Sequence, residues 1–175
     1  MKNESGKSII ILIILTILIM VGVSVVINYA KGMMEETKVQ DLKTNMLLME
    51  AEAKKGLEEV CFQTVNLNKT KQEDLTKINE VKQEFLDGVI LSDSPVEVQE
   101  ATKNVPNVTF DESCYYLDEE TLTEMGIENI NQEEYGYFIV KYDFSNADLE
   151  IINTKGYEGN YTLTQIVQTI EGGQS

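Results

Sequence analysis

The chain has 175 residues, with 30 acidic side chains against 14 basic ones and a formal net charge of −16. It contains no histidine, so Ser-His-Asp hydrolysis, His-supported zinc sites and His-activated thiol chemistry lose their central residue. A surface this acidic repels phosphate groups, which argues against nucleic acid as a partner. We therefore expect a protein that is not an enzyme and needs no metal or cofactor. It has room for one compact domain beyond an apolar segment.

The most distinctive stretch is the uncharged, Ile-rich run from Ser8 to Ala30. As a helix it is long enough to cross a hydrocarbon layer of about 30 Å. The alternative is a cleaved secretory signal, but the apolar core of such a signal has only about 7 to 15 residues. The short first tail favours a cytoplasmic N-terminus. The sequence thus predicts a single-pass protein of the cell membrane, with residues 7–30 in the bilayer and an extracytoplasmic domain.

The predicted membrane helix continues into water, because residues 31–62 contain no proline and are rich in good helix formers. We expect one helix over residues 8–62, whose half from 31 to 62 is amphipathic. Its apolar positions recur three and four residues apart, at Val39, Leu42, Met46, Met49, Ala53, Gly56 and Val60.

One turn of this helix is apolar around its whole circumference. Met46, Leu47, Leu48 and Met49 follow one another without a polar residue. A helix that is apolar all round is covered on more than one side, and a single small domain covers only one. The sequence predicts that the second cover is another subunit.

Shorter elements follow in residues 63–175. A capping box at Thr70 and Glu73 predicts a helix that ends near Gly88. The run "SPVE" from Ser94 predicts a shorter helix with proline at its first position, and a further helix is expected from Asp118 to the residue before Gly126.

The last third of the chain changes its period. In "YGYFIVKYDF" the side chains of Phe138, Val140, Tyr142 and Phe144 share one face, which predicts a strand with a single apolar face. A turn at "SNAD", a return strand at "LEIINTKGY" and a short strand from Asn160 complete an antiparallel meander. The predicted fold class is α+β, with a long N-terminal helix packed on a small C-terminal antiparallel sheet and short connecting helices.

Two local features leave alternatives open. The acidic stretch "FDESCYYLDEE" is a solubilising surface or a calcium site, although it lacks the spacing of a calcium loop. Cys61 and Cys114 form a disulfide or remain two buried thiols.

The short polar leader ending in Gly6, the hydroxyl residue Ser8, the Ile-rich span, the amphipathic continuation and the terminal sheet together resemble the type IV pilin family, including the pseudopilins of type II secretion. The resemblance implies that a prepilin peptidase removes residues 1–6 by cutting between Gly6 and Lys7. It also implies methylation of the new N-terminus and a wait in the membrane before assembly. The partners would be other pilin-like subunits, bundled through their helices in a filament.

Two positions indicate a minor or specialised member. Lys7 stands where the family usually has a large apolar residue, and Ile11 stands where it usually has a glutamate. That glutamate pairs with the terminal amine of a neighbouring subunit, and an unpaired buried charge is costly. The expected function is therefore a structural, pilin-like subunit of a type IV pilus or type II secretion-like filament. The alternative is an uncleaved, membrane-anchored binding protein with an extracytoplasmic domain.

Overall fold

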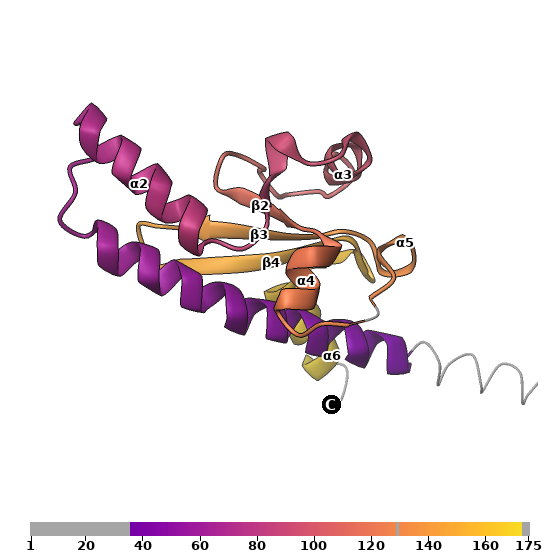
Figure 1. Cartoon of the computed structure of the whole chain (residues 1–175). Coiled ribbons are helices and arrows are strands. Elements are labelled where there is room, and N and C mark those ends of the chain that lie inside the picture. Colours follow the sequence, from indigo (N-terminus) through magenta and orange to yellow (C-terminus); the bar gives the residue numbers. More distant parts are fainter. Residues whose placement is uncertain (1–35, 129, 173–175) are drawn as a thin grey trace, which may run out of the picture. The chain divides into compact units, whose positions relative to one another are not determined.

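The computed structural model describes residues 36–128 and 130–172. A long helix occupies residues 36–64, and the chain from Leu42 onward makes up one compact unit. The protein is α+β, with this helix followed by a five-stranded antiparallel sheet, so the coarse fold class is confirmed (Figure 1).

The long helix contributes one apolar face to the core. Its buried side chains are Leu42, Met46, Met49, Ala53, Leu57 and Val60. All but Leu57 belong to the predicted heptad seam. Residue 56 of that seam is a glycine, and its missing side chain lets the chain of the next helix approach closely.

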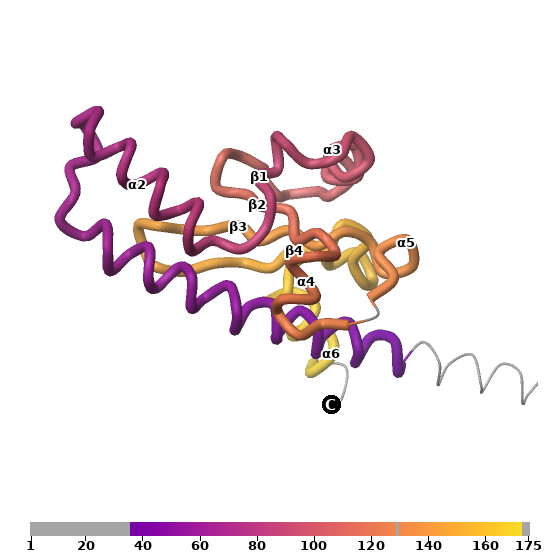
Figure 2. The backbone as a smooth tube through the Cα atoms, viewed as in Figure 1, coloured from indigo at the N-terminus to yellow at the C-terminus, as the bar shows by residue number. Residues whose placement is uncertain are grey.

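The next helix, α2 (Gln72–Phe85), runs back beside the second half of the long helix, as the backbone trace in Figure 2 shows. The predicted capping box is absent. Thr70 instead donates its backbone N–H and its hydroxyl to Asn68 Oδ1, and α2 follows Lys71, which makes no side-chain cap. A local Asn68 turn has taken the place of the cap because Asn side chains compete for nearby backbone donors.

The sheet has the order β1-β2-β3-β4-β5. Its strands are β1 (Val89–Ile90), β2 (Cys114–Leu117), β3 (Phe138–Asp143), β4 (Asp148–Tyr157) and β5 (Asn160–Thr162). The hairpin of β3 and β4, which pairs Val140 with Ile151, and the short β5 are the predicted meander. The first two strands were not predicted.

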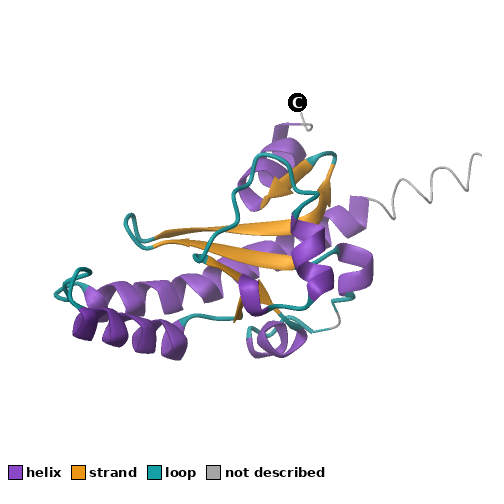
Figure 3. Cartoon of the chain, turned by 90° about the horizontal axis from the view of Figure 1, so that it is seen from above, coloured by secondary structure: helices purple, strands orange, loops and turns teal. Residues whose placement is uncertain are grey.

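Both faces of the sheet are covered (Figures 1 and 3). The sequence had predicted that only one face would be apolar and covered. Phe138 and Val140 pack in the cluster that includes the long helix. Ile139 and Ile152 point to the other face and are buried in a second cluster with Val98. The 3-10 helix η1 (Leu91–Asp93) and α3 (Val96–Thr102) supply the cover on that side.

Three further helices complete the fold. The predicted helix after Asp118 is α4 (Glu119–Glu124), and the Asp118 side chain caps it by accepting from the backbone N–H of Thr121. A short helix, α5 (Gln132–Tyr135), precedes β3. The C-terminal helix α6 (Leu163–Gly172) was not predicted. It packs on the sheet through Leu163 and Ile166.

The membrane prediction needs correction. Within the described residues, no helix is long and apolar enough to cross a bilayer. The long helix is amphipathic, with charged side chains such as Lys55 and Glu58 on the face away from the core. The predicted single-pass membrane protein, with its cytoplasmic N-terminus and extracytoplasmic domain, therefore has no membrane-spanning helix in the described part of the chain. The predicted leader 1–6 and span 7–30 lie outside the described residues.

Candidate functional site

The turn from Met46 to Met49 divides between the core and the surface. Met46 and Met49 are fully buried, whereas Leu47 and Leu48 expose 41% and 46% of their surface. Because successive helical residues are about 100° apart, two residues of this turn face the sheet and the two between them face outward. The domain therefore covers only one side of the apolar turn.

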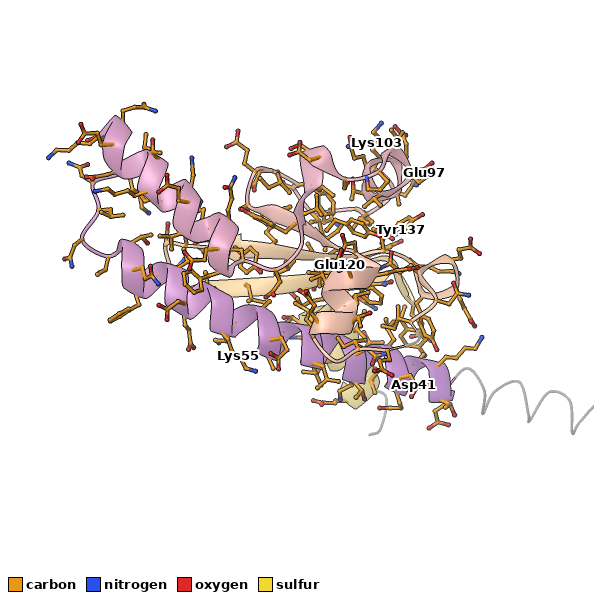
Figure 4. The ribbon with its side chains drawn as sticks, in the orientation of Figure 1. Asp41, Lys55, Glu97, Lys103, Glu120 and Tyr137 are labelled. Carbon is orange, nitrogen blue, oxygen red and sulfur yellow. The ribbon has the colours of Figure 1, made fainter. Side chains whose placement is uncertain are left out.

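The exposed leucines lie on a face of the helix that also carries charge, because helical spacing places Lys55 and Glu58 on the same side. Helical spacing places Ala51 and Phe62 on the same side as Leu47 and Leu48, and both are exposed, Phe62 by 77%. Lys55 lies on this side as well and points away from the sheet (Figure 4). We call Leu47, Leu48, Ala51, Lys55 and Phe62 the outer face of the long helix.

The charged side chains near the outer face form only weak ion pairs and leave its apolar side chains exposed. Lys55 Nζ lies 2.6 Å from a carboxylate oxygen of Glu52, but both side chains are exposed, so this pair contributes little to stability. Among the described residues, the exposed large apolar side chains are Leu47, Leu48, Phe62, Val65 and Val96, and three of these five lie on the outer face. Exposed apolar patches mark interaction surfaces. The outer face can bury apolar area against another helix.

The two cysteines lie on opposite sides of the sheet. Cys61 is partly buried beside the cluster of the long helix, and Cys114 is buried in the cluster on the other face. Both are free thiols, so the disulfide alternative is not realised in this structure. Burial raises the pKa of the Cys114 thiol, which keeps it protonated and unreactive.

The acidic stretch around Cys114 is split by β2. Before the strand, Asp111 accepts hydrogen bonds from the backbone N–H and hydroxyl of Ser113, which lower the pKa of its carboxyl group. After the strand, Asp118, Glu119 and Glu120 line a cavity of about 710 Å³. Across the described residues, no three carboxylate or thiol groups are arranged to hold a metal ion, so the calcium interpretation gains no support.

This cavity was not predicted as a site. It forms where the start of α4, the start of α5 and the η1–α3 turn meet at the end of β2. The run Asp118 to Glu120 was the only local signal, and the other lining residues come from distant parts of the chain. The predicted processing residues Gly6 and Lys7 and the assembly residue Ile11 lie outside the described residues.

No family model matches the chain, and comparisons with curated proteins and with solved structures find no similar protein.

Proposed function

We propose that the protein is a structural, pilin-like subunit that enters a filament with other pilin-like subunits through the outer face of its long helix. The observation that carries this proposal is the exposure of Leu47 and Leu48 on the side of the helix that the protein's own domain leaves uncovered. The resemblance of the leader and helix sequence to type IV pilins supports the same conclusion.

The energetics favour assembly by repetition. Burying the remaining exposed surface of two leucines contributes about 1 to 3 kcal/mol to a contact. That is too little for a stable pair, because association itself costs several kcal/mol. A filament repeats such contacts from one subunit to the next, so weak apolar faces suffice there.

The proposal includes removal of residues 1–6 by a prepilin peptidase. Lys7 would then begin the mature chain, and Ile11 would leave a neighbour's terminal amine without a carboxylate. Stacking of identical copies would bury unpaired amines, which favours a minor subunit over a homopolymer. The mass of the N-terminal peptide from the native cells tests this step, and a peptide that retains Met1 to Gly6 would contradict it.

The assembly surface is tested by the double variant Leu47→Lys with Leu48→Lys. Both side chains are exposed, so the fold should persist, whereas two ammonium groups cannot be buried in a helix–helix contact. We expect the fraction of the protein recovered in sedimenting filaments from the native cells to fall at least about tenfold, the equivalent of about 1.4 kcal/mol.

A matched control carries the same added charge elsewhere. Gln72→Lys with Gln83→Lys changes two exposed positions of α2 and leaves the long helix untouched. Its recovery in filaments should equal that of the unmodified protein. Equal incorporation of both double variants would refute the outer face as an assembly surface.

A further inference from the structure

The cavity at the end of β2 is strongly acidic. Five carboxylates line it, at Asp93, Asp118, Glu119, Glu120 and Glu133. No lysine lines it, and within the described part of the chain none of the five forms an ion pair. The walls therefore hold a concentration of negative charge with no lysine beside it, although Asp118 also accepts from the backbone N–H of Thr121.

The floor of the cavity is aromatic and rigid. The rings of Tyr116 and Tyr137 meet edge to face, with their centroids 6.0 Å apart. The Tyr116 hydroxyl donates to Gln132 Oε1 over 2.6 Å, and Gln132 Nε2 donates to the backbone carbonyl of Leu117 over 3.0 Å. Figure 4 shows Tyr137 beside the strands and Glu120 on α4, two of the residues that line the cavity. The floor is thus set before any ligand arrives.

The negative charge of the carboxylates acts on Tyr116 at the floor of the cavity. Burial raises the pKa of Tyr116, and the nearby Asp118, Tyr137 and Glu119 raise it further. A cation that entered the cavity would therefore meet both carboxylates and the electron-rich rings of tyrosine.

The rim adds an apolar contact. Pro95 lines the cavity, and Val96 next to it is one of the few large apolar side chains on the described surface, with 68% of its surface exposed. A bare metal ion gains nothing from contact with tyrosine rings and the apolar ring of Pro95. An organic cation with an aliphatic stem fits both, and the volume of about 710 Å³ holds more than one side chain.

We propose that this cavity binds a basic segment of a partner protein, through lysine side chains whose ammonium groups meet the five carboxylates and whose stems pack on Tyr137 and Pro95. The site lies on α4, α5 and the η1–α3 turn, and the outer face of the long helix contributes no residue to it. This partner contact is separate from the proposed filament contact.

The test is a titration of the full-length protein with a fluorescein-labelled tetralysine peptide, followed by anisotropy at low ionic strength. The same peptide with acetylated lysine side chains should not bind, because it keeps the stems and loses the charge. Unlabelled spermidine, titrated separately by calorimetry, distinguishes a free polyamine from a peptide segment.

Two double variants localise the binding. Glu120→Gln with Glu133→Gln removes two exposed charges from the cavity, and Glu73→Gln with Glu84→Gln removes two exposed charges from α2. We expect the cavity variant to weaken peptide binding about fivefold to tenfold and the α2 variant to weaken it less than about twofold. Equal weakening by both variants would show non-specific attraction to an acidic surface and overturn the proposal. Absence of peptide binding, or binding of spermidine alone, would overturn it as well.

Discussion

Two buried tyrosines differ in what their hydroxyl groups contact. Tyr116 donates to Gln132 Oε1 over 2.6 Å. Tyr142 is 2% exposed, and its hydroxyl oxygen has no partner of normal hydrogen-bond geometry among the described residues. A buried hydroxyl that makes a bond stabilises the fold, and one that makes none lowers stability by its lost hydration.

We therefore expect substitution by phenylalanine to change stability in opposite ways at Tyr116 and Tyr142. Tyr116→Phe should lower the free energy of unfolding by about 1 to 2 kcal/mol, because it leaves Gln132 Oε1 unpaired. Tyr142→Phe should leave stability unchanged or raise it. Urea denaturation of both variants measures the difference, and a larger loss in Tyr142→Phe would contradict the assignment.

Asp87 and Asp143 hold carboxylates whose pKa values move in opposite directions. Burial, together with the nearby Glu52 and Glu124, raises the pKa of Asp87, and Lys55 only partly offsets this. Hydrogen bonds from Asn146 and Ser145 lower the pKa of Asp143.

The signs of the two pH effects follow from these shifts. The folded state holds the Asp87 proton more tightly than the unfolded chain, so this group lowers stability as pH rises from about 4 through its raised pKa. Asp87→Asn should therefore raise the unfolding midpoint at neutral pH. Asp143 stabilises above its unfolded pKa and loses that contribution as pH falls, so Asp143→Asn should lower the midpoint at neutral pH and have less effect in acid. Urea midpoints between pH 3 and pH 7 measure both, and changes of the same sign would contradict them.

At the scale of elements, the long helix and α2 meet at a glycine. A Cβ at Gly56 would lie 2.0 Å from the carbonyl oxygen of Phe85, far inside contact distance. Gly56→Ala should destabilise the protein by about 1 to 3 kcal/mol, although alanine favours helix by about 1 kcal/mol. Gly172→Ala in α6 is the control, since a Cβ there meets nothing within 4 Å. Thermal unfolding compares the two, and a neutral Gly56→Ala would show that the helices separate easily.

Helices and strands whose apolar residues recur at a regular spacing could be predicted from the sequence. The other elements show why this spacing alone is insufficient. The seam from Leu42 to Val60 appears in the structure, and so does strand β3, although Phe138, Ile139 and Val140 are all buried. Strand β2 is buried on both faces, so its residues do not alternate, and β1 has only two residues. Helix α6 did carry a signal, because Leu163, Ile166, Val167 and Ile170 follow helical spacing, but only a short strand from Asn160 was predicted in this region.

The two candidate sites differ in the same way. The exposure of Leu47 and Leu48 could be anticipated, because four apolar residues in one turn cannot all face one sheet. The cavity could not, because Asp93, Glu120 and Glu133 come together only after η1, α4 and α5 have packed around β2. A cluster assembled from distant segments leaves no spacing in the sequence.

At the scale of the whole molecule, repulsion between carboxylates is the dominant electrostatic term. The chain has 30 acidic residues and 14 lysines, so even if every lysine paired with one carboxylate, 16 carboxylates would remain without an ion pair. Contacts such as Lys43 Nζ to Glu171, at 2.9 Å, offset only part of this. Folding brings the unpaired charges closer together, and self-repulsion lowers the stability of the compact state.

Salt should therefore stabilise this protein. The screening length falls from about 10 Å at 0.1 M to about 3 Å at 1 M, which weakens repulsion between neighbouring carboxylates. We expect the thermal midpoint to rise by a few degrees over this range, equivalent to about 1 kcal/mol for a chain of this size. Sodium, potassium and choline chlorides at equal ionic strength should give the same rise, because screening depends on charge alone. A rise with only one cation would indicate specific binding, and a fall with all three would show that attractive ion pairs outweigh the repulsion.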